Sequence, residues 1–162
     1  MEILIVSPSA SVPNGNSHTT EWWASELSAL GHEVRISTGT DDGPADLLIA
    51  LHAEKSHEAL ARFRTNHEKA RTVVALAGTD LYPELSPTSL ASLEMADRIV
   101  VLQGKALARI PDACRSKARI IHLSASPRPS PGEKEDPKDD FTVCVVGHLR
   151  TVKDPMRTAR AA

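Results

Sequence analysis

Apolar residues along the first 123 positions alternate between short continuous runs and stretches with helical spacing. Trp23, Leu27 and Leu30 illustrate the spacing of four and three residues that is typical of an amphipathic helix. Such stretches predict helices over residues 19–30, 56–66, 86–96 and 105–110. The continuous runs have strand length and predict strands over residues 3–6, 32–37, 47–51, 72–77, 98–102 and 118–123.

The predicted strands are rich in Val, Ile and Leu at successive positions, which is typical of parallel strands with helices on both sides. Their order with the helices, βαββαβαβαβ, predicts an α/β fold with a doubly wound, Rossmann-like parallel sheet over residues 1–123. Ligands of such sheets bind outside the carboxyl ends of the strands. The loops that follow the strands are therefore the expected place for binding and catalytic residues.

Residues 124–140 interrupt this pattern and predict a semi-rigid linker, because they contain four prolines and a run of Glu, Lys and Asp. Residues 141–146 form another apolar run of strand length. One strand and one helix cannot bury a core of their own. We therefore interpret residues 141–162 as the start of a truncated second domain, which the missing remainder of the chain would complete.

Composition and charge narrow the classes of function. Lys and Arg number 19 and Asp and Glu 21, so the chain lacks the basic excess of a non-specific nucleic-acid binder. No apolar run approaches the ~20 residues of a membrane span, and no basic stretch precedes the first apolar run. Cys114 and Cys144 have no metal-ligand spacing. We expect a cytoplasmic protein without a bound metal, a membrane span or a nucleic-acid partner.

Two candidate sites follow the first and third strands. Gly15 and Asn16 precede a predicted helix, where free backbone amides can bind an anion or sugar hydroxyls. The segment is not a GxGxxG fingerprint, and an ordinary Asn-Gly turn explains it equally well. His52 directly follows the strand over residues 47–51 and could carry a proton or donate a hydrogen bond. The alternative is a histidine that only closes the strand end.

A third candidate, Gly78-Thr79-Asp80, follows the strand over residues 72–77. The glycine allows close approach of a ligand to the backbone, the threonine supplies a hydroxyl, and the carboxylate could act as a base or bind hydroxyls. Threonine and aspartate are also common turn caps, so a purely structural role is the alternative.

The fourth candidate is a loop after the strand over residues 141–146. It holds His148, Arg150 and Lys153 next to Gly147. Cationic side chains and glycine amides suit a diphosphate. A solvated basic turn is the alternative.

The segment around this loop, VGHLRTVKDP at residues 146–155, resembles the opening of the second domain in GT-B glycosyltransferases of the retaining, family-4 kind. Four further segments appear in order: MEILIVSP at 1–8, LLIALHA at 47–53, VALAGTDLY at 74–82 and EMADRIVVLQ at 94–103. Together the five segments are similar to the selenosugar synthases of selenoneine biosynthesis. The resemblance covers essentially the whole chain.

The resemblance implies the N-terminal half of a GT-B fold, with an acceptor domain over residues 1–123 and the start of a nucleotide-sugar domain at 141–162. It implies an enzyme that joins the sugar of UDP-N-acetylglucosamine to the selenium of selenophosphate, forming a C–Se bond without a metal. A UDP-sugar transferase with an oxygen acceptor is one alternative. A non-catalytic nucleotide-binding Rossmann module is another.

The resemblance also implies roles for the second-domain loop. Lys153 matches the lysine that binds the donor diphosphate. His148 stands where the family commonly has Arg, and Arg150 could substitute for that contact. The carboxylate-rich donor motif of the family would lie beyond residue 162, so we expect these residues alone to be inactive.

In the first domain, Gly15 and Asn16 match the glycine-containing acceptor loop of the family, and Gly78 and Thr79 match a loop that faces the cleft. His52 and Asp80 are then the expected catalytic residues, which would orient the acceptor or the sugar. Because selenophosphate is an anion, we expect Asp80 to bind sugar hydroxyls or orient His52 rather than contact the acceptor.

Overall fold

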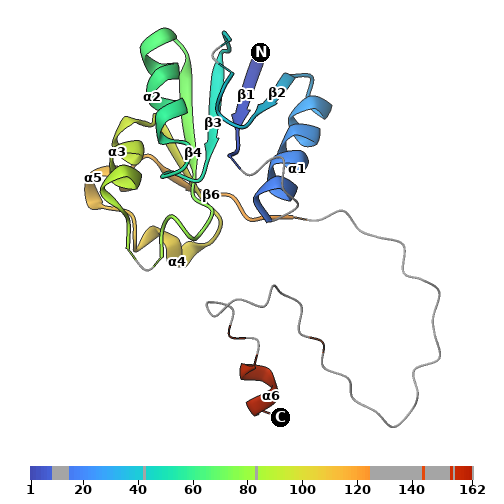
Figure 1. Ribbon diagram of the computed structural model, residues 1–162, viewed down its shortest axis with the longest axis vertical. Coiled ribbons are helices and arrows are strands. Elements are labelled where there is room, and N and C mark those ends of the chain that lie inside the picture. The colour runs from blue at the N-terminus through green and yellow to red at the C-terminus, as the bar shows by residue number, and fades with distance from the viewer. Residues whose placement is uncertain are drawn as a thin grey trace, which may run out of the picture. The chain divides into compact units, whose positions relative to one another are not determined.

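The computed structural model describes residues 1–8, 15–41, 43–82, 84–124, 144, 154 and 156–161 (Figure 1). The chain divides into two compact units, Met1–Ala125 and Ser126–Ala162. In the second unit the described part consists of one short helix, α6 (Arg157–Ala161), with Met156 before it, and the single residues Cys144 and Asp154. The predicted linker and the predicted strand over residues 141–146 lie outside the described residues, apart from residues 124 and 144.

The first unit contains a six-stranded sheet in which all neighbouring strands are parallel. The order across the sheet is β2-β1-β3-β4-β5-β6. The strands are β1 (Glu2–Val6), β2 (Glu33–Ser37), β3 (Leu47–Leu51), β4 (Arg71–Ala75), β5 (Arg98–Val101) and β6 (Ala118–Ile120). After β2 the chain passes β1 to reach β3, so the topological switch point lies between β1 and β3. The predicted doubly wound, Rossmann-like parallel α/β sheet is confirmed.

Helices cover both faces of this sheet (Figure 1). The helix α1 (Gly15–Ala29) packs on one face, and α2 (His57–Asn66) and α3 (Pro87–Met95) pack on the other. Two short helices, α4 (Gly104–Leu107) and α5 (Asp112–Arg115), join β5 to β6. In the described residues no helix has both the length and the apolar character needed to cross a membrane.

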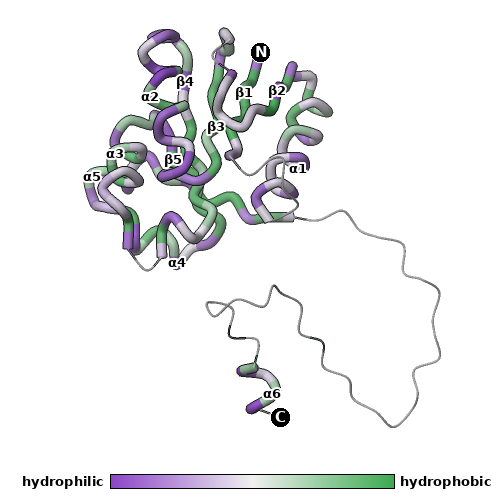
Figure 2. Tube along the Cα trace, viewed as in Figure 1, coloured by the Kyte–Doolittle hydropathy of each residue, from purple (hydrophilic) through white to green (hydrophobic). Residues whose placement is uncertain are grey.

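Alternate residues of the central strands supply two separate cores. In β1, Leu4 and Val6 pack with α2 and α3, whereas Ile3 and Ile5 pack with α1. All four side chains are at most 1% exposed. Full burial of such a side chain stabilises the fold by roughly 1.5–3 kcal/mol. Burial on both faces therefore explains why every residue from Ile3 to Val6 is apolar. Figure 2 shows hydrophobic residues concentrated along the sheet.

The helix α1 begins four residues earlier than the predicted start at residue 19. Its first turns bury polar rather than apolar side chains, namely Ser17 and Thr20. The hydroxyl of Thr20 donates to the backbone oxygen of Asn16 at 2.8 Å, which satisfies it inside the helix. A hydrophobic pattern cannot reveal a turn that is buried through hydroxyl side chains, so the prediction missed it.

A polar cluster fixes the amino-terminal edge of the sheet. The Asp97 carboxylate accepts hydrogen bonds from the backbone nitrogen of Thr72 at 2.8 Å and from its hydroxyl at 3.1 Å. Arg64 and Arg71 form ion pairs with the same carboxylate at 3.5 and 3.8 Å. Burial alone would raise the pKa of Asp97, but these hydrogen bonds and cations outweigh it and lower the pKa from its ordinary value.

Candidate functional site

The loops that carry the predicted site residues of the first unit meet at one edge of the sheet. Parallel strands all end at the same edge, so the loop after β3 and the loop after β4 are neighbours there (Figure 1). His52 follows β3 directly, and Thr79 lies in the loop after β4. The helix α1 also begins at this edge: Asn16 and Thr19 near its start line a crevice together with Leu51 and residues of the loop after β4.

His52 has an unusual backbone conformation and a nearly buried side chain. Its φ of 72° lies in the left-handed region, which is costly for a residue with a Cβ. Two backbone hydrogen bonds hold it there: its nitrogen donates to the oxygen of Ala75 at 2.9 Å, and its oxygen accepts from Ser56 at 3.0 Å. The residue is 4% exposed. The structure thus holds the imidazole in a fixed position at the strand end.

The contacts of the imidazole favour one tautomer. The backbone N–H of Lys55, which can only donate, lies 3.4 Å from Nδ1. Nδ1 is then the acceptor, and the hydrogen of the neutral ring is on Nε2. Nε2 lies 3.1 Å from Oγ1 of Thr79, so it donates to that hydroxyl. Thr79 is exposed, and with this tautomer its own hydroxyl hydrogen is not used in the contact with His52.

Asp80 connects the two loops through backbone amides. One carboxylate oxygen accepts from the nitrogen of Ala53 at 2.7 Å, and the other accepts from the nitrogens of Ala77 and Gly78 at 2.9 Å each. The residue is 2% exposed. Its carboxylate is 3.9 Å from Nδ1 of His52, beyond hydrogen-bond distance. This geometry favours the turn-capping interpretation of Asp80, as a positioning residue, over a catalytic one.

Gly78 shapes the same loop through its backbone. Its φ of 104° is one that residues with a Cβ rarely adopt. A Cβ added at this position would meet no atom within 4 Å, so conformation rather than crowding requires glycine here. The open space beside Gly78 belongs to a cavity of about 250 Å³ at the ends of β4 and β5.

The structure brings only part of the predicted acceptor loop to this edge. Asn16 lines the narrow crevice between α1 and the ends of β3 and β4, whose volume of about 10 Å³ leaves room for about one water molecule. Gly15, the first residue of α1, is exposed and lines neither this crevice nor the 250 Å³ cavity. Of the predicted residues, Asn16, His52, Gly78, Thr79 and the buried Asp80 therefore share this edge.

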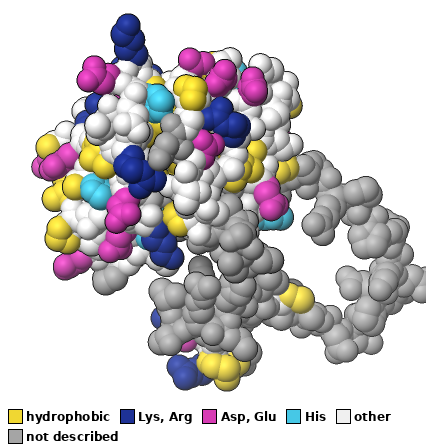
Figure 3. All heavy atoms as spheres, turned by 45° about the horizontal axis from the view of Figure 1, so that its top comes forward, with side chains coloured by type: hydrophobic (Ala, Val, Ile, Leu, Met, Phe, Trp, Pro, Cys, Tyr) yellow, Lys and Arg dark blue, Asp and Glu magenta, His cyan; other side chains and the backbone are white. Residues whose placement is uncertain are grey.

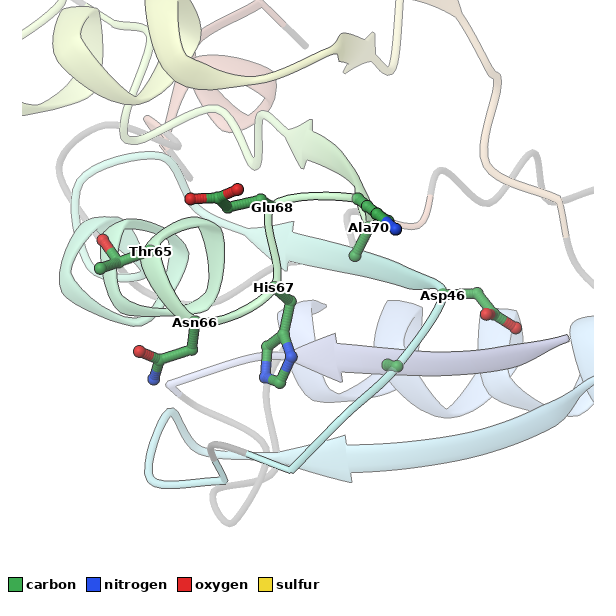
Figure 4. Close-up of a pocket in the computed structure, with 8 residues that line it drawn as sticks. Asp46, Thr65, Asn66, His67, Glu68 and Ala70 are labelled. Carbon is green, nitrogen blue, oxygen red and sulfur yellow. The ribbon is translucent and has the colours of Figure 1, made fainter.

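A hollow of about 680 Å³ lies at the opposite, amino-terminal edge. Its walls come from the end of α2, the segment that leads to β4 and the residues before β3 (Figure 4). The Asp46 carboxylate there accepts from the backbone nitrogen of Glu2 at 2.8 Å, and the His67 ring packs against Phe63. Acidic and basic side chains are interspersed on the face that Figure 3 brings forward. Nothing in this mixture of charges selects an anion or a cation.

The predicted diphosphate loop cannot be placed in the same way. His148, Arg150 and Lys153 lie outside the described residues, so their roles stay predictions. Among the residues that are described, no group of three or more His, Cys, Asp or Glu side chains is arranged to hold a metal ion.

Two residues at the carboxyl edge were not predicted as site residues. Tyr82 and Gln103 both line the 250 Å³ cavity. Gln103 comes two residues after the end of β5, so the same reasoning that singled out His52 after β3 could have found it. Tyr82 lies in the segment over residues 78–82 that the sequence singled out after β4, but its proximity to Gln103 depends on the conformation of that loop.

Comparison with known proteins does not identify a family. No family model matches the chain, and a search of curated proteins finds no match. The resemblance to glycosyltransferases therefore rests on the five sequence segments alone.

Proposed function

We propose that the chain belongs to a GT-B glycosyltransferase, and that the first unit provides the acceptor side of its active site. The proposed reaction transfers the sugar of UDP-N-acetylglucosamine to the selenium of selenophosphate. Support comes from the five segments in their order and from a parallel sheet whose carboxyl edge gathers Asn16, His52 and Thr79.

The observation that carries this proposal is a chain of hydrogen-bond donors that all point in one direction. The Lys55 amide donates to His52, and Nε2 of His52 donates to the hydroxyl of Thr79. In this tautomer the exposed hydroxyl of Thr79 accepts from His52 and keeps its own hydrogen free to donate outward. Donors aligned in this way strengthen one another. Their end presents a donor to an anion, as a selenophosphate acceptor requires.

In the proposed step a lone pair on selenium forms the C–Se bond to the anomeric carbon of the sugar. The bond between that carbon and the UDP oxygen breaks, and its electron pair leaves with UDP. Thr79 holds an oxygen of the acceptor, while His52 fixes the direction of the Thr79 hydroxyl. Asp80 holds the loops after β3 and β4 together through hydrogen bonds from three backbone amides. Cations of the loop with Lys153 would stabilise the departing diphosphate.

The test is release of UDP from UDP-N-acetylglucosamine with and without selenophosphate, by a protein that includes a complete second domain. Thr79→Val removes the hydroxyl and keeps the shape. The matched control is Thr65→Val, because Thr65 is an exposed threonine on α2 at the opposite edge. The proposal expects selenophosphate-dependent release that Thr79→Val lowers and Thr65→Val leaves unchanged.

The alternatives give different results in the same assay. Release that requires an alcohol instead of selenophosphate would assign an oxygen acceptor. Binding of UDP without turnover of any acceptor would indicate a non-catalytic nucleotide-binding module.

A further inference from the structure

The cavity of about 250 Å³ at the carboxyl ends of β4 and β5 has an apolar floor and a polar rim. Leu81, Val101 and Ala106 form the floor, and each is at most 3% exposed. Tyr82 and Gln103 bring a phenol hydroxyl and a side-chain amide to the rim. An apolar floor with a few polar groups is typical of small-molecule sites.

The lining excludes a charged group. No charged side chain contributes to the cavity wall. The guanidinium of Arg109 lies 5.4 Å from the ring centroid of Tyr82, where it contacts the ring and is not part of the lining. Transfer of an ion to such a surface costs free energy that nothing there would offset. A phosphate or selenophosphate would therefore meet no cationic side chain in the lining of this cavity.

The size of the cavity limits the ligand to a single ring. Pockets that hold a whole drug-sized molecule have volumes of roughly 300–1,000 Å³, so this cavity is too small for a nucleotide sugar. It is large enough for one ring-sized group. Gly78 adds no side chain to the lining, and a Cβ added there would meet no atom within 4 Å.

The rim groups can form hydrogen bonds with such a ring. Nε2 of Gln103 lies 3.4 Å from the hydroxyl of Tyr82, which is near the limit for a hydrogen bond. Gln103 is exposed and Tyr82 is half-buried, so both polar groups are accessible from solvent. A ring with one apolar face and hydroxyl or amide groups along its edge matches this arrangement. Monosaccharides have this chemistry.

We propose that this cavity binds the uncharged monosaccharide ring of the reaction served by the neighbouring edge, with Gln103 and Tyr82 as specificity-determining residues. The inference rests on the proposed function for the class of reaction. It assigns the neutral ring to the cavity and leaves the anionic acceptor to Thr79, which lies outside the cavity lining.

The test is a titration of the isotope-labelled 162-residue chain, followed by NMR, with N-acetylglucosamine, UDP and inorganic phosphate separately. N-acetylglucosamine is expected to cause saturable shifts of the amides of Gly78, Leu102 and Gln103, and the two anions are not. Gln103→Leu should weaken the binding roughly two- to tenfold, the effect of one hydrogen bond. Asn66→Leu, an exposed amide at the opposite edge, is the matched control and should change nothing.

The absence of saturable shifts at these amides would overturn the inference. The inference would also be overturned if Gln103→Leu binds N-acetylglucosamine as tightly as the unaltered chain does, or if UDP or phosphate shifts the signals of the same amides. Melting temperatures of both variants equal to that of the unaltered chain would show that neither has lost its fold. Binding does not require turnover, so a protein that binds the sugar but releases no UDP would contradict the proposed function and leave this inference intact.

Discussion

Replacement of Asp80 by asparagine separates a positioning role from a catalytic one. The carboxylate accepts three backbone amides, from Ala53, Ala77 and Gly78. An asparagine keeps one acceptor oxygen, and its NH₂ group must face at least one of these N–H groups. At least one buried amide of the loops then loses its partner. The remaining bonds lose the charge of the acceptor.

The magnitude follows from these bonds. A hydrogen bond to a charged group contributes about 1.5–3 kcal/mol and a neutral one about 0.5–1.5 kcal/mol. Loss of one charged bond, with weakening of the others, predicts that Asp80→Asn lowers the free energy of unfolding by about 2–5 kcal/mol. For a chain of this length, that corresponds to a fall in Tm of roughly 4–20 °C.

The assay is thermal unfolding followed by circular dichroism, with Asp112→Asn as control. The side chain of Asp112 is 88% exposed and pairs only with Arg115 one helical turn away, so its replacement should change Tm by less than about 2 °C. An unchanged Tm in Asp80→Asn, together with a large loss of turnover in a protein with a complete second domain, would refute the positioning role. That result would instead assign Asp80 a catalytic role.

Three further changes test other parts of the structure. Folding lowers the pKa of Asp97 from 3.8, so the ionised carboxylate stabilises the folded chain above about pH 4, and this stabilisation is lost as pH falls through the folded pKa. In urea unfolding between about pH 2 and 5, the free energy of unfolding of Asp97→Asn should therefore fall less with decreasing pH than that of the unaltered chain. Ser7 is buried, and its Oγ has no hydrogen-bond partner among the residues that the structure describes, so Ser7→Ala should leave stability unchanged or raise it by about 1 kcal/mol. A clear loss of Tm would reveal a partner. Gly78→Ala should lower stability by about 1–2 kcal/mol through its φ alone, and no loss in denaturant unfolding would contradict that.

The sheet was predictable because its strands are buried on both faces, but the strand ends were not. The run over residues 72–77 predicted a longer strand than β4, which ends at Ala75. The nitrogen of Ala77 donates to the carboxylate of Asp80 and not to a neighbouring strand. At the sheet edge, β6 ends at Ile120, whereas the predicted strand ran to residue 123; of the described residues after β6, only Ile121 still donates its nitrogen to the neighbouring strand, at the oxygen of Val101. Continuous apolar runs thus locate strands, while hydrogen-bond competition sets their ends.

The candidate site was predictable only in part for a similar reason. The position of His52, one residue after a strand, follows from the parallel topology. The capture of three backbone amides by Asp80 depends on two loops that lie 27 residues apart in the sequence. The same holds for the contact between His52 and Thr79. Spacing along the chain gives no sign of such contacts.

The central claim is that the carboxyl edge, through His52 and Thr79, serves sugar transfer to an anionic acceptor. The most direct measurement is the rate of selenophosphate-dependent UDP release by Thr79→Val and by Thr65→Val in a protein with a complete second domain. A hydrogen bond to an anion contributes about 1.5–3 kcal/mol, so Thr79→Val should lower kcat/KM for selenophosphate roughly ten- to hundredfold. Because Nε2 of His52 loses its acceptor, the same change should lower stability by about 0.5–1.5 kcal/mol, or Tm by roughly 1–6 °C. Thr65→Val should match the unaltered protein. Equal kcat/KM values in the two variants, or UDP release that does not depend on selenophosphate, would contradict the account.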